Sequence, residues 1–298
     1  MKKYIYYILC LGLFIAMQFS CSEDDLSSTS VIPDDKSEKN EFDKWIEANY
    51  IIPYNIDFKY RFDDKESDMN YNLEPANKKK AIRMAKMIQH LILGTYDEHT
   101  GSRDFIRTYY PKILFMVGSP AYNNNGTIQL ATAENGYKIT INNVNYIPLT
   151  DLTEADIVQF NTYYFKTLHH EFAHILHQTK PYSPSFKEIS GASYVQDSWN
   201  KKYENKSPLL DGFITAYASK SQDEDFVELY SVYITSTEEE WKNKLVQAKD
   251  SGALIINNKL DIVTNYIEGT WKLDMDSLRK IVLRRQSEIL DLDLDTLN

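Results

Sequence analysis

Cysteine is nearly absent from this chain of 298 residues, which contains only Cys10 and Cys21. Cys10 falls inside an apolar run near the start, and Cys21 follows shortly after that run. Two thiols in a leading segment cannot build the disulfide framework that stabilises small secreted domains. The chain is, however, long enough to bury a sizeable apolar core without one.

Basic residues are in the minority. Lys and Arg number 33 against 43 Asp and Glu, so the formal net charge is −10. Residues 1–20 carry two lysines and no acidic residue, and without them the net charge becomes −12. Proteins that bind nucleic acid through its phosphates need a surplus of positive charge. We therefore expect no nucleic acid partner.

Several motifs of large protein classes are missing from the sequence. It contains no phosphate-binding loop, no dinucleotide-binding glycine fingerprint, no Gly-x-Ser-x-Gly elbow and no internal repeat. After the leading apolar run there is no second run long enough to span a bilayer. Any contact with a membrane is therefore expected to come through an attached lipid.

The first twenty residues have the composition of a targeting segment. Lys2 and Lys3 precede an apolar run over residues 4–17, and Ser20 stands just before Cys21. This arrangement resembles a bacterial lipobox, which implies cleavage before Cys21 and lipid attachment to it. The segment Ser22-Glu23-Asp24-Asp25, acidic after its serine, resembles the surface-export signal of Bacteroidetes lipoproteins, which implies an outer-membrane lipoprotein exposed on the cell envelope. An ordinary secretory signal is the alternative.

Three regions follow from composition: a lipoprotein signal peptide (1–20), a flexible acidic tether (21–41) and a single folded domain (42–298). Residues 42–150 contain the β patterns, and residues 151–298 are mostly helical, so the predicted fold class is α+β. Strands are expected at 55–62, 112–117, 126–133 and 137–147, the last three as a small meander. Helices are expected at about 75–94, 153–178, 223–235, 238–250, 257–267 and 277–290.

The segment His170-Glu171-Phe172-Ala173-His174 is an HExxH motif on the predicted helix 153–178. Residues four apart share one face of a helix, so both imidazoles can bind one metal ion while Glu171 acts beside it as general base. This pattern indicates a zinc-dependent hydrolase, in which zinc lowers the pKa of its bound water towards about 7.

Hydrolytic zinc sites usually have three protein ligands, so a third must come from elsewhere. His177 shares roughly the same face, but a rise of about 1.5 Å per residue puts it roughly 10 Å along the axis from His170. It is therefore interpreted as a flanking or core residue. His169 points away from the motif face and is expected to face solvent or to support a ligand.

A carboxylate on the helix at 223–235 can supply the third ligand. Glu224 and Glu228 are four residues apart, so one can bind zinc while the other orients a ligating histidine. We predict Glu224 as the ligand and Glu228 as its support; the reverse assignment and Asp225 remain open. Tyr217, in the segment before this helix, is the candidate donor to the oxyanion that forms during amide hydrolysis.

These residues resemble the putative zinc-binding metallopeptidase family of Bacteroidetes lipoproteins, which belongs to the gluzincin group. The resemblance covers roughly residues 42–290 and rests on HExxH with Gln178, Pro184, Phe186, Ile189, Tyr194 and Trp199, then Tyr217-Ala218 and Glu224-Asp225-Phe226-Val227-Glu228. The last element, with its tyrosine seven residues earlier, is also similar to the catalytic region of anthrax lethal factor-type peptidases. That similarity implies Glu224 as zinc ligand and Tyr217 as transition-state donor.

The resemblance implies a zincin-like domain with a small mixed sheet, and residues 137–146 are the candidate strand for holding extended substrate at the cleft. The predicted function is a zinc metallopeptidase acting on protein or peptide substrates. The alternative is a catalytically silent surface lipoprotein that binds glycan or protein as an accessory to an outer-membrane nutrient-uptake complex, beside which members of this family are often encoded.

Overall fold

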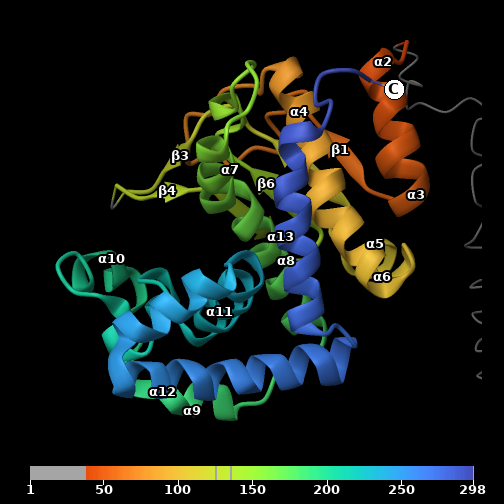
Figure 1. The fold of residues 1–298 in the computed structure, drawn as a ribbon. Coiled ribbons are helices and arrows are strands. Elements are labelled where there is room, and N and C mark those ends of the chain that lie inside the picture. Colours follow the sequence, from red (N-terminus) through yellow and green to blue (C-terminus); the bar gives the residue numbers. More distant parts are fainter. Residues whose placement is uncertain (1–37, 125, 135, 298) are drawn as a thin grey trace, which may run out of the picture. The chain divides into compact units, whose positions relative to one another are not determined.

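The computed structural model of the protein describes residues 38–124, 126–134 and 136–297, and it combines many helices with one small sheet of mixed strand direction (Figure 1). The predicted α+β fold class is confirmed. The predicted signal peptide, the lipidated Cys21 and most of the predicted tether lie outside the described residues, so they stay predictions. Residues 40–298 form one compact unit.

The main sheet has four strands, in the order β1 (Asp57–Lys59), β2 (Ile113–Met116), β6 (Lys138–Ile141) and β5 (Ala131–Glu134). The first three run parallel to one another, whereas β5 pairs antiparallel with β6. A separate antiparallel ribbon is formed by β3 (Ala121–Tyr122) and β4 (Ile128–Gln129). The strand predicted at 55–62 is confirmed in shorter form as β1, with Ile56, Phe58 and Tyr60 buried on alternate positions.

Two sequence predictions about this sheet are wrong. The three strands expected to form a meander do not, because β2 and β6 are parallel and only β5 and β6 make a hairpin. Residues 137–146 are not the edge of the cleft either. All four residues of β6 are buried because β2 and β5 flank it, and after Asn143 the chain turns into the short helix η4 (Val144–Tyr146). The strand at this edge of the sheet is β5, and β1 is at the other edge.

The N-terminal part of the unit is helical around β1. Asn40 caps α2 (Glu41–Ile46), which continues through η2 (Glu47–Ile51) into α3 (Ile52–Tyr54). The connection from β1 to β2 contains α4 (Lys78–Ile88), η3 (Gln89–Leu93), α5 (Gly94–Thr100) and α6 (Asp104–Tyr109).

The helix predicted to end at Gly94 instead continues to Thr100 and ends at Gly101, whose φ of +69° suits glycine. Gly94 is helical, with φ −63°. A Cβ atom at Gly94 would lie 2.7 Å from the end of the Arg285 side chain, so glycine at this position leaves room for the guanidinium beside the helix.

The motif helix is confirmed as a continuous run from α7 (Glu154–Phe160) through the π-helical turn η5 (Asn161–Phe165) to α8 (Lys166–Thr179). It begins at Thr153, whose side chain forms a reciprocal capping box with Asp156. The helix ends at Thr179, and Lys180 caps it in an extended conformation. Lys180 precedes Pro181, and the residue before a proline disfavours helical backbone angles.

Short elements connect α8 to the next long helix: α9 (Ser185–Ser190), η6 (Gly191–Ser193), η7 (Gln196–Ser198), α10 (Trp199–Lys202), η8 (Pro208–Asp211) and η9 (Tyr217–Lys220). The predicted helix at 223–235 is confirmed as α11 (Gln222–Thr235), and Ser221 caps it by accepting from the Glu224 amide. Its acidic first turn is favoured by the positive end of the helix dipole.

Two helices predicted at 238–250 and 257–267 are joined in α12 (Glu238–Trp271), which is broken by the left-handed backbone of Lys249. Gly252 lets α12 lie against η8, since a Cβ there would be 2.1 Å from the Leu209 carbonyl oxygen. The last predicted helix is confirmed as α13 (Met275–Glu288), followed by η10 (Ile289–Asp291).

Figure 1 shows α13 (dark blue) lying beside α5 (yellow), so the C-terminal helix packs on the N-terminal part of the unit. One apolar cluster extends from Phe42 to Leu294 and includes Phe172 of the motif. The Phe172 ring meets Tyr96, Phe105 and Tyr110 edge-on. This packing fixes one face of α8 and leaves the opposite face for the site. Among the described residues, no helix has the length and apolar composition to cross a membrane.

Candidate metal centre

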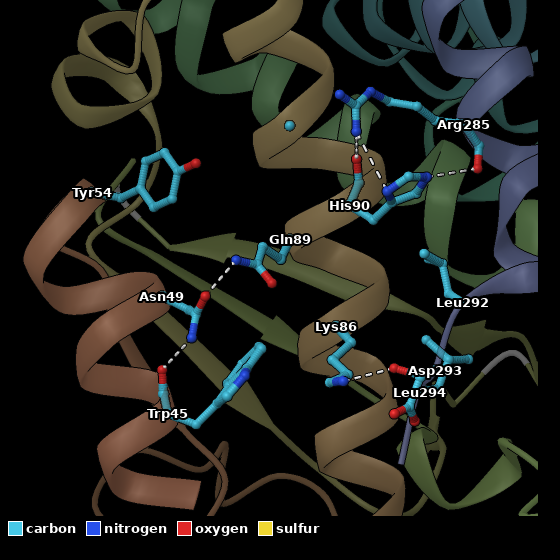
Figure 2. Close-up of a pocket in the computed structure, with 11 residues that line it drawn as sticks. Trp45, Asn49, Tyr54, Lys86, Gln89, His90, Arg285, Leu292, Asp293 and Leu294 are labelled. Carbon is cyan, nitrogen blue, oxygen red and sulfur yellow. Dashed lines mark hydrogen bonds between the residues drawn. The ribbon is translucent and has the colours of Figure 1, made fainter. Parts of the chain in front are cut away.

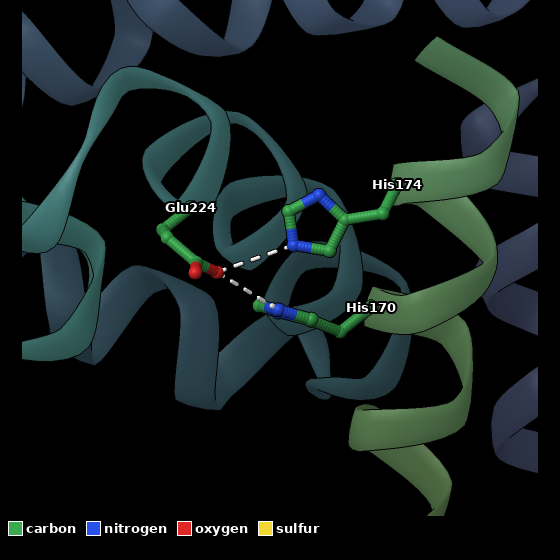
Figure 3. Close-up of side chains that lie close together, drawn as sticks. All are labelled: His170, His174 and Glu224. Carbon is green, nitrogen blue, oxygen red and sulfur yellow. Dashed lines mark hydrogen bonds and ion pairs between the residues drawn. The ribbon is translucent and has the colours of Figure 1, made fainter. Parts of the chain in front are cut away.

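Three predicted ligands meet between α8 and α11. The Nε2 atoms of His170 and His174 each lie 3.2 Å from the same oxygen, Oε2 of Glu224 (Figure 3). One donor atom from each residue lies within 4.8 Å of the others. Two imidazole nitrogens and one carboxylate oxygen are the donor set of hydrolytic zinc sites, so these residues fit a zinc ion.

Glu228 lies behind His170 rather than among the converging donors. Its Oε1 atom is 2.9 Å from His170 Nδ1 and accepts a hydrogen bond of 2.9 Å from Lys166, while Thr215 donates to Oε2 at 2.6 Å. Burial raises the pKa of the Glu228 carboxyl, but Lys166 and His170 outweigh it and hold that pKa below its usual range. The ionised carboxylate therefore fixes the ring so that Nε2 faces Glu224.

His177 supports the second histidine instead of joining the donor group. Its Nε2 atom lies 3.0 Å from His174 Nδ1, and its ring packs on Tyr182 and Phe226. His177 thus contacts Nδ1 of His174 in the same way that Glu228 contacts Nδ1 of His170. From its position three residues after His174, His177 was interpreted as a flanking or core residue, and its contact with His174 Nδ1 was not predicted.

His169 and Asp225, which are adjacent in sequence to two of the predicted ligands, are buried and contact other side chains instead of the donor group. His169 is 1% exposed, so its expected solvent-facing position is wrong; its Nδ1 lies 3.0 Å from the Tyr96 hydroxyl. Burial lowers the pKa of His169 to about 3, which keeps the ring neutral. Asp225, an open alternative for the third ligand, is instead buried against Lys259 at 2.6 Å and accepts from the Tyr194 hydroxyl.

Tyr217 and Lys220 hold the outer oxygen of Glu224. The Tyr217 hydroxyl donates to Oε1 at 2.8 Å, and the Lys220 ammonium lies 3.0 Å from both that oxygen and the hydroxyl. Burial, with the Glu224 charge, raises the pKa of Tyr217 well above its usual value, so the hydroxyl keeps its proton. Sequence reasoning missed Lys220, although its position four residues before Glu224 is the spacing of a helical ion pair.

Glu171 lines the same cleft as the donor group and is 8% exposed. Among the described residues, its carboxylate has no ion-pair or hydrogen-bond partner, in contrast to Glu224 and Glu228. Both oxygens are thus available to accept a proton from water.

The cleft has a volume of about 780 Å³ and is bordered on one side by β4, β5 and the residue between them. The opposite wall comes from η7, α10 and η9, which contribute Asp197, Trp199 and Tyr217. The edge strand β5 therefore faces the cleft in the place that the sequence assigned to residues 137–146.

A second cavity, of about 390 Å³, lies between α2, α4 and the C-terminal residues 292–294 and shares no lining residue with the cleft (Figure 2). Several of its polar side chains bond to one another or to the backbone: Gln89 donates to Asn49, and Lys86 donates to the Asp293 carbonyl. Arg285 donates to the His90 carbonyl. The hydrogen bonds around this cavity join residues 86–90 to the C-terminal residues Arg285 and Asp293.

The donor set and the cleft define a candidate zinc site in an α+β protein. The chain belongs to the family described as "Putative zinc-binding metallo-peptidase", whose model matches residues 35–276. It is similar to a crystal structure of a putative zinc-binding metallo-peptidase from Bacteroides caccae, with 38% sequence identity and a TM-score of 0.73. That similarity covers 90% of this chain and 100% of the other. No curated protein matches the chain.

Proposed function

We propose that the protein is a zinc-dependent peptidase of the gluzincin type, related in its catalytic region to anthrax lethal factor-type peptidases. The observation that carries the proposal is the convergence of His170, His174 and Glu224 beside a free Glu171. In this proposal the three converging residues hold zinc, which supplies a Lewis acid and activates water when bound.

The other side chains then have separate tasks in peptide hydrolysis. Glu171 takes a proton from the attacking water and passes it to the leaving amine. Tyr217 turns its hydroxyl hydrogen from Glu224 Oε1 to the carbonyl oxygen as negative charge develops there, while Lys220 stays on Oε1. Glu228 keeps the His170 ring oriented throughout. A structural zinc site would not need an unpaired carboxylate at Glu171, and this distinction favours catalysis.

The proposal includes a place of action. Lipid attachment at Cys21 and the acidic residues after it would anchor the enzyme to the outer membrane on the cell surface, where its substrates are proteins or peptides. A nutrient-uptake complex in the same membrane is the proposed partner.

Metal analysis and a peptide-library digest test the proposed function together. The purified protein is expected to hold about one equivalent of zinc and to cleave a subset of peptides. Cleavage should stop after treatment with a chelator and return when zinc is added. Protein that holds no zinc tightly would instead support the binding lipoprotein, and cleavage unaffected by the chelator would contradict a metallopeptidase.

Tyr217→Phe is expected to lower kcat by about 10²-fold with little change in KM, because one donor to the developing oxyanion is lost. Steady-state kinetics on a peptide from the library measure this effect. Tyr122→Phe is the matched control, since Tyr122 is 61% exposed and not among the residues that line the cleft. Equal kcat values for the two variants would remove Tyr217 from the catalytic group.

A further inference from the structure

Six charged side chains line the cleft, and five of them have partners or tasks: Lys166 is paired with Glu228, Lys220 with Glu224, and Glu171 is the proposed base. The sixth is Asp197. Among the described residues, this exposed carboxylate has no ion-pair or hydrogen-bond partner. The cleft wall thus presents one negative charge that the proposed mechanism does not use.

An aromatic side chain accompanies this carboxylate. Trp199, two residues later, lines the same cleft and is partly buried. Its ring lies 5.2 Å from the Tyr217 ring, centroid to centroid, with the two planes nearly perpendicular at 86°. A carboxylate and an indole that line one cleft can together bind a cationic side chain, the first through its charge and the second through the negative face of its ring.

One backbone and one side-chain hydrogen bond hold this wall in position relative to the metal donors. Val195 N–H donates to the Ser219 carbonyl at 2.8 Å, and Tyr194 donates to Asp225 at 2.9 Å. Gln196, between these anchors and Asp197, has φ +52°, a left-handed conformation that is unfavourable for a residue with a side chain. This turn puts Asp197 and Trp199 on the cleft, while the intervening residue is not part of its lining.

We propose that Asp197 and Trp199 form a subsite for a basic side chain, arginine or lysine, of the peptide substrate. This inference rests on the proposed peptidase function and names its substrate class. Lys220 does not occupy it, because its ammonium lies 3.0 Å from Glu224 and from the Tyr217 hydroxyl rather than on Asp197. The net charge of −10 adds a long-range attraction for cationic peptides.

Equilibrium binding tests the subsite without requiring turnover. Short peptides carry one arginine at each position in turn, and each is matched by a peptide with citrulline, the uncharged isostere, at the same place. The zinc-loaded Glu171→Gln protein is expected to bind the arginine peptide about tenfold more tightly than its citrulline match at one position. Isothermal titration calorimetry measures both affinities.

Variants then assign this preference to the two side chains. Adding Asp197→Asn or Trp199→Leu is expected to bring the affinity ratio of the two peptides close to one, whereas Asp197→Glu should keep it above one. Glu204→Gln, which removes an exposed charge outside the cleft, should leave the ratio unchanged.

Three results would overturn the subsite: no binding of any arginine peptide, equal affinities at every position, or a ratio that Asp197→Asn does not change. Its failure is distinguishable from failure of the proposed function. Wild-type protein that binds arginine peptides preferentially but cleaves none would refute the peptidase and keep the subsite. Wild-type protein that cleaves arginine and citrulline peptides equally would do the reverse.

Discussion

Glu171→Gln is expected to lower kcat by about 10²- to 10⁴-fold while the protein keeps its zinc. Glutamine has nearly the same shape as glutamate but cannot accept the proton of water. The metal content should not change, because the converging donor atoms belong to His170, His174 and Glu224. Peptide cleavage rates and zinc content, measured on the same preparation, provide both values.

Glu188→Gln is the control for this variant, since Glu188 is an exposed carboxylate on α9 outside the cleft. It should cleave as fast as wild type. If Glu171→Gln holds zinc and cleaves within a few-fold of the wild-type rate, another group must act as the base. If it loses zinc, Glu171 takes part in binding the metal.

Lys259→Met is expected to lower the free energy of unfolding by about 3–5 kcal/mol. Lys259 and Asp225 are both 1% exposed, with Nζ and Oδ2 2.6 Å apart, and the ammonium also donates to the Gly212 carbonyl. Methionine preserves most of the volume but leaves Asp225 as a buried carboxylate with no opposite charge. Urea unfolding of the zinc-free protein, followed by circular dichroism, measures the change.

An exposed ion pair in the same helix supplies the control. Lys242 and Glu238 have side chains 69% and 76% exposed, so Lys242→Met should leave the free energy of unfolding nearly unchanged. Removing both buried charges, as Asp225→Asn with Lys259→Met, should recover part of the loss. Equal stability of the Lys259→Met and Lys242→Met variants would show that the buried pair contributes little.

The sequence predicted the helices better than the sheet, because the signals for a helix come from residues close together in the chain. Capping residues such as Thr153 and Ser221 and the apolar periodicity of α8 and α11 act within a few residues. Strand order instead depends on partners far apart in the chain: Ile113 pairs with Asp57 on one side and Lys138 on the other. Hydrophobic alternation cannot reveal such partners, which explains the wrong assignment of the edge strand.

The candidate site divides in a similar way. The helical spacing of His170 and His174 brought them to one face, and the spacing of Glu224 and Glu228 narrowed the carboxylates to two. Which of these faces the histidines depends on how α8 and α11 pack, since Glu228 reaches Nδ1 and Glu224 reaches Nε2 of the same ring. Lys220 and Asp197 were not predicted as site residues, because they line a cleft whose walls come from distant segments and leave no pattern in the sequence.

The unequal surroundings of the two Glu224 oxygens bear on which metal the site selects. Oε1 is already engaged by Tyr217 and Lys220, so only Oε2 is free to act as a ligand. A carboxylate limited to one donor atom keeps the coordination number low, as zinc prefers, and disfavours calcium, which takes six to eight oxygen ligands. In the proposed zinc site, the pair of donors on Oε1 would thus act against the binding of larger ions, although neither Tyr217 nor Lys220 is among the three converging residues.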